Sequence, residues 1–196
     1  MQQVASIIDE LEEAVRNGSS AKRVETLRQV TDLFLHDADR LSEEQVRVFD
    51  DVLCHLVTRV ESRVKAELGA RLAPLERAPA AVVERLARDD QIAVAETVLA
   101  SSTTLTTGTL VDIAKSKGQD HLFVISGRPN LPEAVTDVLV ERGERRVIRK
   151  LADNTTARFS EAGGLGLRSL RPSAFISSAS FARTLLVDHC ANRANS

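Results

Sequence analysis

The sequence predicts an all-α protein in which an N-terminal helical bundle precedes an α-solenoid of short helical repeats. Three observations predict this fold class. Apolar residues recur at helical spacing from residue 4 to residue 151, and no clear run alternates apolar and polar residues as a half-buried strand would. A further pattern recurs with a period of roughly 25 residues, within the range of stacked helical repeats. With 196 residues, 43% of them hydrophobic, the chain can bury a core without disulfides or metals.

The first two helices of the predicted bundle are defined by apolar stripes and by the residues that separate them. The first stripe covers residues 4–15 and ends before Gly18, which takes the left-handed conformation at a helix end at low cost. Ser19 can cap a second helix, whose stripe covers residues 24–35. Short links of this kind favour antiparallel neighbours, so residues 1–72 predict a three-helix bundle.

The third helix of the bundle begins at a capping box. The Ser42 hydroxyl and the Gln45 amide can each satisfy an unpaired backbone N–H of the other residue. An apolar stripe then runs without interruption from Val46 to Leu68, which predicts one long helix. Three residues that disfavour helix continuation end it, Gly69, Pro74 and Pro79.

Residues 73–161 predict the repeat region. Gly118 and Gly143 occupy equivalent places in the recurring pattern, and so do Leu105 and Leu131. Each unit is a short helix pair that cannot bury its apolar face alone. The region holds about two and a half units, which is few for a free-standing array. We therefore expect the N-terminal bundle to cap it.

Composition excludes several classes of function. The net charge of −2 argues against a protein that binds nucleic acid by neutralising phosphates. Aromatic residues make up 3% of the chain, which leaves little for a base-stacking platform. Two cysteines suit a reducing compartment, and neither a signal peptide nor an apolar run long enough to insert in a membrane is visible. The predicted location is cytoplasmic.

Five segments carry a resemblance to a known family: residues 46–72, 86–90, 94–99, 119–122 and 135–143. The chain resembles the alphaproteobacterial family of unknown function DUF2336 over about residues 4–162. This family is similar to HEAT and leucine-rich-variant helical repeats, so the resemblance implies a bacterial cytoplasmic protein with HEAT-like repeats, and it carries no reaction. After Ala162 the likeness stops. Residues 162–196 are rich in Ser, Gly and Arg, with a net charge of +3. We expect this tail to add little to the fold, and its composition is compatible with disorder.

Two groups of histidine-containing residues could form a site. His36, with acidic neighbours at the end of a helix, could accept a phosphoryl group, although an ordinary surface histidine is the more common case. The pairs Cys54-His55 and His189-Cys190 could form a zinc site. Adjacent residues on a helix point about 100° apart, however, so Cys54 and His55 converge poorly on one ion. We therefore predict no metal and no cofactor.

A cluster of basic residues is the strongest candidate for a binding surface. Its members are Arg128, Arg142, Arg145, Arg146, Arg149 and Lys150. Such a cluster could receive an acidic peptide or a phosphate. A solvated helix face is the more common case, and Asp137, Glu141 and Glu144 could neutralise part of the charge.

The sequence predicts a protein–protein interaction or scaffold module, because helical repeats offer an extended face whose side chains vary without disturbing the core. The expected partner is a protein with an acidic surface. The alternative is a signalling component in which His36 accepts a phosphoryl group. No motif indicates an enzyme.

Overall fold

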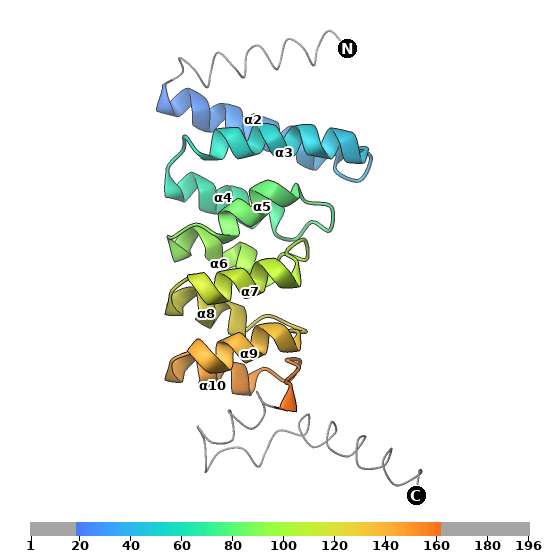
Figure 1. Ribbon diagram of the computed structural model, residues 1–196. Helices are drawn as coiled ribbons and strands as arrows, with labels where there is room; N and C mark the ends of the chain where they lie inside the picture. Colours follow the sequence, from blue (N-terminus) through green and yellow to red (C-terminus); the bar gives the residue numbers. More distant parts are fainter. Residues whose placement is uncertain (1–18, 162–196) are drawn as a thin grey trace, which may run out of the picture. The chain divides into compact units, whose positions relative to one another are not determined.

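The computed structural model describes residues 19–161 (Figure 1). This part of the chain is helical with turns between helices and contains no strand, which confirms the predicted all-α class. The helices in it are α2 (Ser20–Asp37), α3 (Glu43–Val57), α4 (Ser62–Leu72), α5 (Ala80–Ala87), α6 (Ile92–Ser101), α7 (Thr107–Ser116), α8 (Gln119–Ser126), α9 (Glu133–Arg142) and α10 (Arg145–Asp153).

The chain divides into two compact units between Thr109 and Leu110. In the first unit, α3 packs against α2 and α5, while α6 packs against α4 and α5. In the second unit, α8, α9 and α10 all pack against one another. The predicted division into residues 1–72 and 73–161 stays a prediction. The predicted helix over residues 4–15 and the tail 162–196 lie outside the described residues.

The core of the first unit is made of aliphatic residues around one aromatic pair. Phe34 of α2 is fully buried and meets Phe49 of α3 edge to face, with ring centroids 5.4 Å apart. The largest fully buried aliphatic side chains of this unit are Leu27, Leu53, Leu56, Leu72, Leu86 and Leu99. Each belongs to the apolar stripe of its helix, so burial of these stripes holds the helices together.

Both predicted N-terminal caps in this unit are confirmed. The Ser19 hydroxyl accepts a hydrogen bond from the backbone N–H of Lys22, at 3.3 Å. At the start of α3, the N–H of Gln45 donates to the Ser42 hydroxyl at 3.3 Å, and the N–H of Ser42 donates to the Gln45 side-chain oxygen at 2.8 Å. These bonds satisfy donors that the first turn of a helix leaves unpaired.

The predicted long helix from Val46 to Leu68 is wrong, because the chain turns between α3 and α4. Thr58 ends α3: its hydroxyl donates to the carbonyl of His55 at 2.8 Å. Glu61 is extended, with ψ of 157°, and precedes α4. A threonine among valines has a low helix propensity and can bond its own backbone, which favours an end here. The apolar stripe continues on both sides of the turn, so periodicity alone does not reveal it.

Helix α5 follows Pro79, which provides no side-chain cap. Its cap comes from α3, because the Asp50 carboxylate accepts hydrogen bonds from the N–H groups of Ala81 and Val82, both at 2.8 Å. A carboxylate at this end also interacts favourably with the helix dipole. Asp50 therefore fixes where α5 begins relative to α3.

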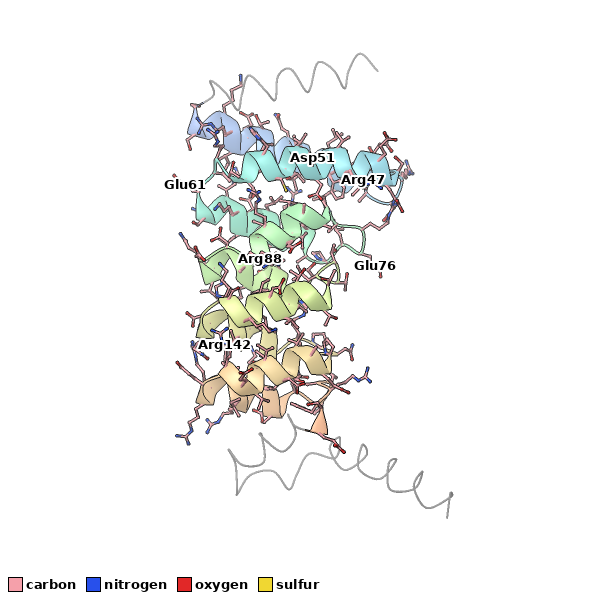
Figure 2. The ribbon with its side chains drawn as sticks, viewed as in Figure 1. Arg47, Asp51, Glu61, Glu76, Arg88 and Arg142 are labelled. Atoms are coloured by element: carbon pink, nitrogen blue, oxygen red, sulfur yellow. The ribbon has the colours of Figure 1, made fainter. Side chains whose placement is uncertain are left out.

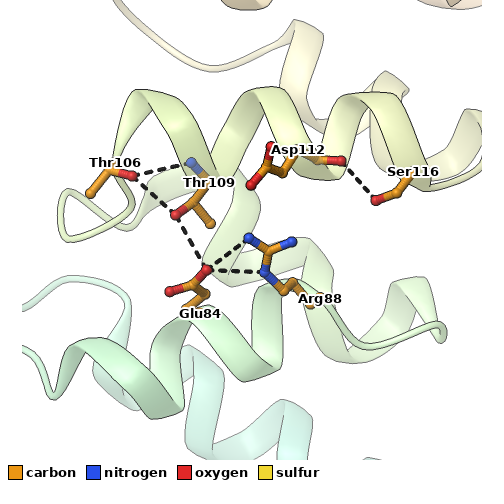
Figure 3. A network of polar contacts seen from close by, with 6 residues as sticks. All are labelled: Glu84, Arg88, Thr106, Thr109, Asp112 and Ser116. Atoms are coloured by element: carbon orange, nitrogen blue, oxygen red, sulfur yellow. Dashed lines mark hydrogen bonds and ion pairs between the residues drawn. The ribbon is translucent and has the colours of Figure 1, made fainter.

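A polar network ties the first turn of α7 to α5 (Figure 3). The Thr106 hydroxyl accepts from the N–H of Thr109 at 3.1 Å, and the Thr109 hydroxyl donates to Glu84 at 3.4 Å. Arg88 donates to the same Glu84 oxygen through two nitrogens, at 2.8 and 3.0 Å. The Glu84 carboxylate thus accepts hydrogen bonds from Arg88, at the end of α5, and from Thr109 of α7.

Helix starts in the second half of the described chain recur at regular intervals. One series begins at residues 92, 119 and 145, and the alternate series begins at residues 107 and 133. Leu105 and Leu131, which occupy equivalent places in the sequence repeat, are both buried. Leu105 lies between α6 and α7, and Leu131 lies between α8 and α9. This spacing agrees with the expected repeat of roughly 25 residues. The solenoid arrangement and its likeness to HEAT repeats stay predictions.

We predict that Asp50→Ala lowers the free energy of unfolding by about 1–2 kcal/mol, because two donors at the start of α5 lose their partner. Urea denaturation followed by circular dichroism measures this. The control is Asp51→Ala, which removes an exposed carboxylate one residue away (Figure 2) and should change stability by less than about 0.5 kcal/mol. Equal effects of the two variants would contradict the capping role of Asp50.

Candidate anion-binding site

A cleft in the second unit lies between α8 and α10. Its volume is about 660 Å³, and it is lined by Phe123, Arg145, Arg146, Arg149, Lys150 and Asp153. Phe123 comes from α8 and the other lining residues come from α10. The cleft is thus a mostly cationic surface around one aromatic ring.

Burial of the opposite face of α10 determines which side chains reach the cleft. Val147, Ile148 and Leu151 are buried. With about 100° between successive residues, the positions occupied by the cationic residues fall on the other side of the helix. Arg145, Arg146 and Arg149 are accordingly exposed, and Lys150 is half-buried.

Polar contacts between the ends of neighbouring helices hold α10 beside α8. The side chain of Gln119, at the start of α8, donates to the carbonyl of Arg142 and accepts from the N–H of Glu144, both at 2.9 Å. It therefore bridges the turn at Gly143, just before α10 begins. At the other end, the Asn154 side chain donates to the carbonyls of Ser126 at 3.0 Å and Arg128 at 2.6 Å.

Two cations rest against the ring of Phe123. The Lys150 Nζ lies 4.1 Å from the ring centroid, and the Arg146 guanidinium carbon lies 5.6 Å from it. Both distances are within the range of a cation–π attraction. Gly127 leaves the room that Lys150 needs, because a Cβ there would overlap Cε of Lys150 and lie 2.9 Å from its Nζ. The lysine thus lies over the ring, with its side-chain end in the space that the glycine leaves.

The charges of the cleft are only partly compensated. Arg146 forms an ion pair with Asp120 of α8, at 2.6 Å. Arg145, Arg149 and Lys150 form no ion pair with any residue from 19 to 161. Asp153 adds one negative charge to the lining. Among the described residues, the cleft therefore keeps an excess of positive charge.

Two residues of the predicted cluster do not line the cleft. Arg142 donates through its guanidinium to the carbonyl of Ala114, near the end of α7 (Figure 2). Arg128 is half-buried, and burial lowers the pKa of its guanidinium. Partner binding by the predicted cluster stays a prediction, but the structure brings four of its members, from Arg145 to Lys150, into one cleft.

The source of the neutralising charge differs from the expectation. In the described chain, Asp137, Glu141 and Glu144 form no ion pair with a basic residue, and Asp137 instead accepts a hydrogen bond from Ser160 at 2.6 Å. Asp120 supplies the counter-charge because it lies 26 residues before Arg146, close to one repeat length. The acidic residues nearest in sequence, Glu141 of α9 and Glu144 before α10, form no ion pair with the basic residues of the described chain.

Sequence analysis also missed Phe123, Asp120 and Asp153. For Phe123 and Asp120, the repeat spacing in the sequence contained a signal. Phe123 precedes Arg149 by the same spacing that separates Asp120 from Arg146, so a repeat of about this length places both on the neighbouring helix beside the basic residues. Asp153 carries no such signal, because it extends the basic helix by one further turn.

The other sequence candidates do not assemble into a site in the described residues. His36 is exposed in the last turn of α2, with no hydrogen bond or ion pair to residues 19–161, and its role as phosphoryl acceptor stays a prediction. No group of three or more His, Cys, Asp or Glu residues in that range could hold a metal. His189 and Cys190 lie outside it.

Cys54 faces a carboxylate rather than a base. Its Sγ lies 3.8 Å from the Asp50 carboxylate. Burial, together with the negative charge of Asp50, raises the pKa of the Cys54 thiol to about 11. A thiol with a raised pKa is a poor nucleophile and a poor metal ligand, because both roles need the thiolate.

These features describe an all-α protein built from short helices, with a cationic cleft on its second unit. Residues 94–169 match the model of a family described as "Uncharacterised protein conserved in bacteria (DUF2336)". The resemblance drawn from the sequence is therefore confirmed over this segment, which includes the whole cleft and ends slightly beyond the expected limit at residue 162. No curated protein and no solved structure matches the chain. None of the helices described for residues 19–161 has the length and apolar character needed to span a bilayer.

We predict that Cys54 reacts slowly with iodoacetamide near neutral pH and that its rate rises steadily up to pH 10. With a pKa of about 11, only about 0.1% of the thiol is ionised at pH 8, against roughly a quarter for an ordinary cysteine. Mass spectrometry of a Cys190→Ser variant measures the rate at Cys54 alone, with glutathione as the reference thiol. A rate that levels off below pH 9 would contradict the raised pKa.

Proposed function

We propose that this protein is a non-enzymatic interaction module that binds an acidic segment of a partner protein in the cleft between α8 and α10. One observation supports this most strongly. Four cationic side chains surround Phe123, and three of them have no counter-ion among the described residues. A partner that supplies negative charge would provide the counter-ions that residues 19–161 do not.

The arrangement of charge on α10 has a cost in the free protein. Arg145 and Arg149 are separated by four residues, as are Arg146 and Lys150, so like charges face each other along the helix. Each such pair disfavours a helix by a few tenths of a kcal/mol. An acidic ligand would remove this repulsion as well as add attraction.

The cleft also has the geometry to orient a ligand. Guanidinium groups present several donors in a fixed plane and match a carboxylate with two parallel hydrogen bonds. The half-buried face of Phe123 and the carbon stems of the basic residues offer apolar area to the remainder of a peptide. Charge then steers the partner to the cleft, and the apolar floor adds contact area.

We predict that the double variant Arg145→Glu/Arg149→Glu weakens binding of an acidic peptide at least about tenfold, or about 1.4 kcal/mol. The probe is a fluorescein-labelled peptide in which Asp and Glu alternate with Gly and Ser, and the readout is fluorescence anisotropy. The difference should shrink with salt, since the Debye length falls from about 30 Å at 0.01 M to about 8 Å at 0.15 M. The variant should stay folded, because acidic residues in the first turn of a helix are favourable.

The matched control is Arg40→Glu/Arg59→Glu, which makes the same change in net charge at two exposed arginines of the first unit. If binding depends on the cleft, this control should retain the affinity of the natural sequence to within about twofold. Asp153→Asn provides the opposite test, since it removes the one negative charge from the lining and should tighten binding. Equal losses in both double variants would overturn the proposal.

A further inference from the structure

The cations of the cleft differ in their contacts. Lys150 lies over Phe123 with its side-chain end above Gly127, and Arg146 is paired with Asp120. Arg145 and Arg149 carry no such restraint from the described residues and lie one helical turn apart on an exposed face. The cleft thus combines one positioned ammonium group with two guanidinium groups that can close on a ligand.

We propose, on the basis of the function proposed above, that the acidic group the cleft binds is a phosphorylated serine or threonine of the partner protein. A phosphorylated side chain brings a charge of about −1.5 to −2 and three acceptor oxygens on one centre. Those oxygens can accept from Arg145, Arg149 and Lys150 together. A single carboxylate offers one charge and two oxygens, which leaves part of this donor set unused.

The size of the cleft favours a phosphorylated peptide over a free ion. Its volume is about 660 Å³. An inorganic phosphate would fill a small part of this space. A peptide carries carbon atoms on both sides of the phosphoryl group, and these can cover the ring.

The lining also gives the ligand a preferred orientation. Asp153 follows Arg149 by four residues, at the C-terminal end of α10, and it repels a dianion. The phosphoryl group therefore belongs beside Arg145, Arg149 and Lys150, on the side away from Asp153.

Three labelled peptides of one sequence test the inference against the full chain by fluorescence anisotropy: one with Ser, one with Glu and one with phosphoserine at the central position. We expect the phosphoserine peptide to bind at least about tenfold tighter than the Glu peptide. Its advantage should grow between pH 5 and pH 7, because the second pKa of a phosphate ester is about 6.

The Glu peptide is also the control for the protein's own titration. The acidic and histidine side chains on or next to the two helices are Asp153 of α10, Asp120 and His121 of α8, and Glu144, which precedes α10. Any change in their charge acts on both anionic peptides, so only the difference between the two peptides reports the phosphate. A difference that does not change with pH would overturn the inference.

Gly127→Ala tests whether the position of the Lys150 ammonium group matters, because it changes no charge. It keeps every charge but pushes the Lys150 ammonium group away from its place over Phe123. We expect it to weaken both anionic peptides, and the phosphoserine peptide severalfold more than the Glu peptide, because the phosphoryl group has the larger charge. The matched control is Gly118→Ala, where a Cβ meets no atom within 4 Å. Thermal unfolding followed by circular dichroism checks that both variants are folded.

The outcomes separate the two proposals. If the Glu peptide and the alternating acidic peptide bind but phosphoserine brings no gain, the proposed function stands and the phosphate inference falls. If no anionic peptide binds, both fall. If inorganic phosphate displaces the labelled peptide as effectively as unlabelled phosphoserine peptide, or if phosphatidylserine vesicles bind while peptides do not, the assignment to a phosphorylated protein segment is overturned.

Discussion

The structure depends on helix ends that are completed by side chains from other helices. The helices α4, α5, α6, α8, α9 and α10 have no side-chain cap at their own N-terminal residue. Short helices leave a large share of their backbone groups unpaired, because each end exposes four. Asp50 supplies acceptors to the start of α5, and Arg142 donates to a carbonyl near the end of α7. Apolar burial brings the helices together, and these bonds pair backbone groups at the start of α5 and near the end of α7.

Side chains that complete the ends of other helices also position the two helices of the cleft. Within the second unit, side-chain contacts between different helices and turns span 22 to 28 residues, as between Gln119 and Glu144 or between Asn154 and Ser126. This spacing sets α10 beside α8 with its basic face next to Phe123. The cationic side chains are therefore placed by backbone capping and by the buried Val147 and Leu151, rather than by ion pairs with acidic neighbours. Such a surface can change its charged residues without loss of its framework.

Much of the fold is predictable from the sequence, because helical periodicity and caps are local. Ser19 and the Ser42–Gln45 box begin helices as expected, and the spacing of Gly118 and Gly143 marks real turns between helices. The turn after Thr58 is not predictable in this way, since the apolar stripe runs through it and the competing hydrogen bond of a threonine leaves no clear pattern.

The cleft is predictable only in part, for a related reason. The basic residues of α10 are visible as a cluster in the sequence, but their partners lie one repeat earlier on α8. Local charge patterns suggested neutralisation by Glu141 and Glu144, whereas Asp120 supplies it. Arg142 belongs to the charge cluster in the sequence, but its guanidinium donates a hydrogen bond to the backbone carbonyl of Ala114. This contact depends on the tertiary structure and is not visible in the sequence.

The most direct test of an anion-binding cleft on α8 and α10 is to map amide chemical-shift changes by NMR as the full chain is titrated with the alternating acidic peptide. The account predicts changes that saturate and concentrate on these two helices, with the largest at Phe123, Arg145 and Arg149. Amides of α2 to α6 should stay unchanged, because that unit contributes no residue to the cleft. Saturating changes centred on another surface, with none on α8 or α10, would contradict it.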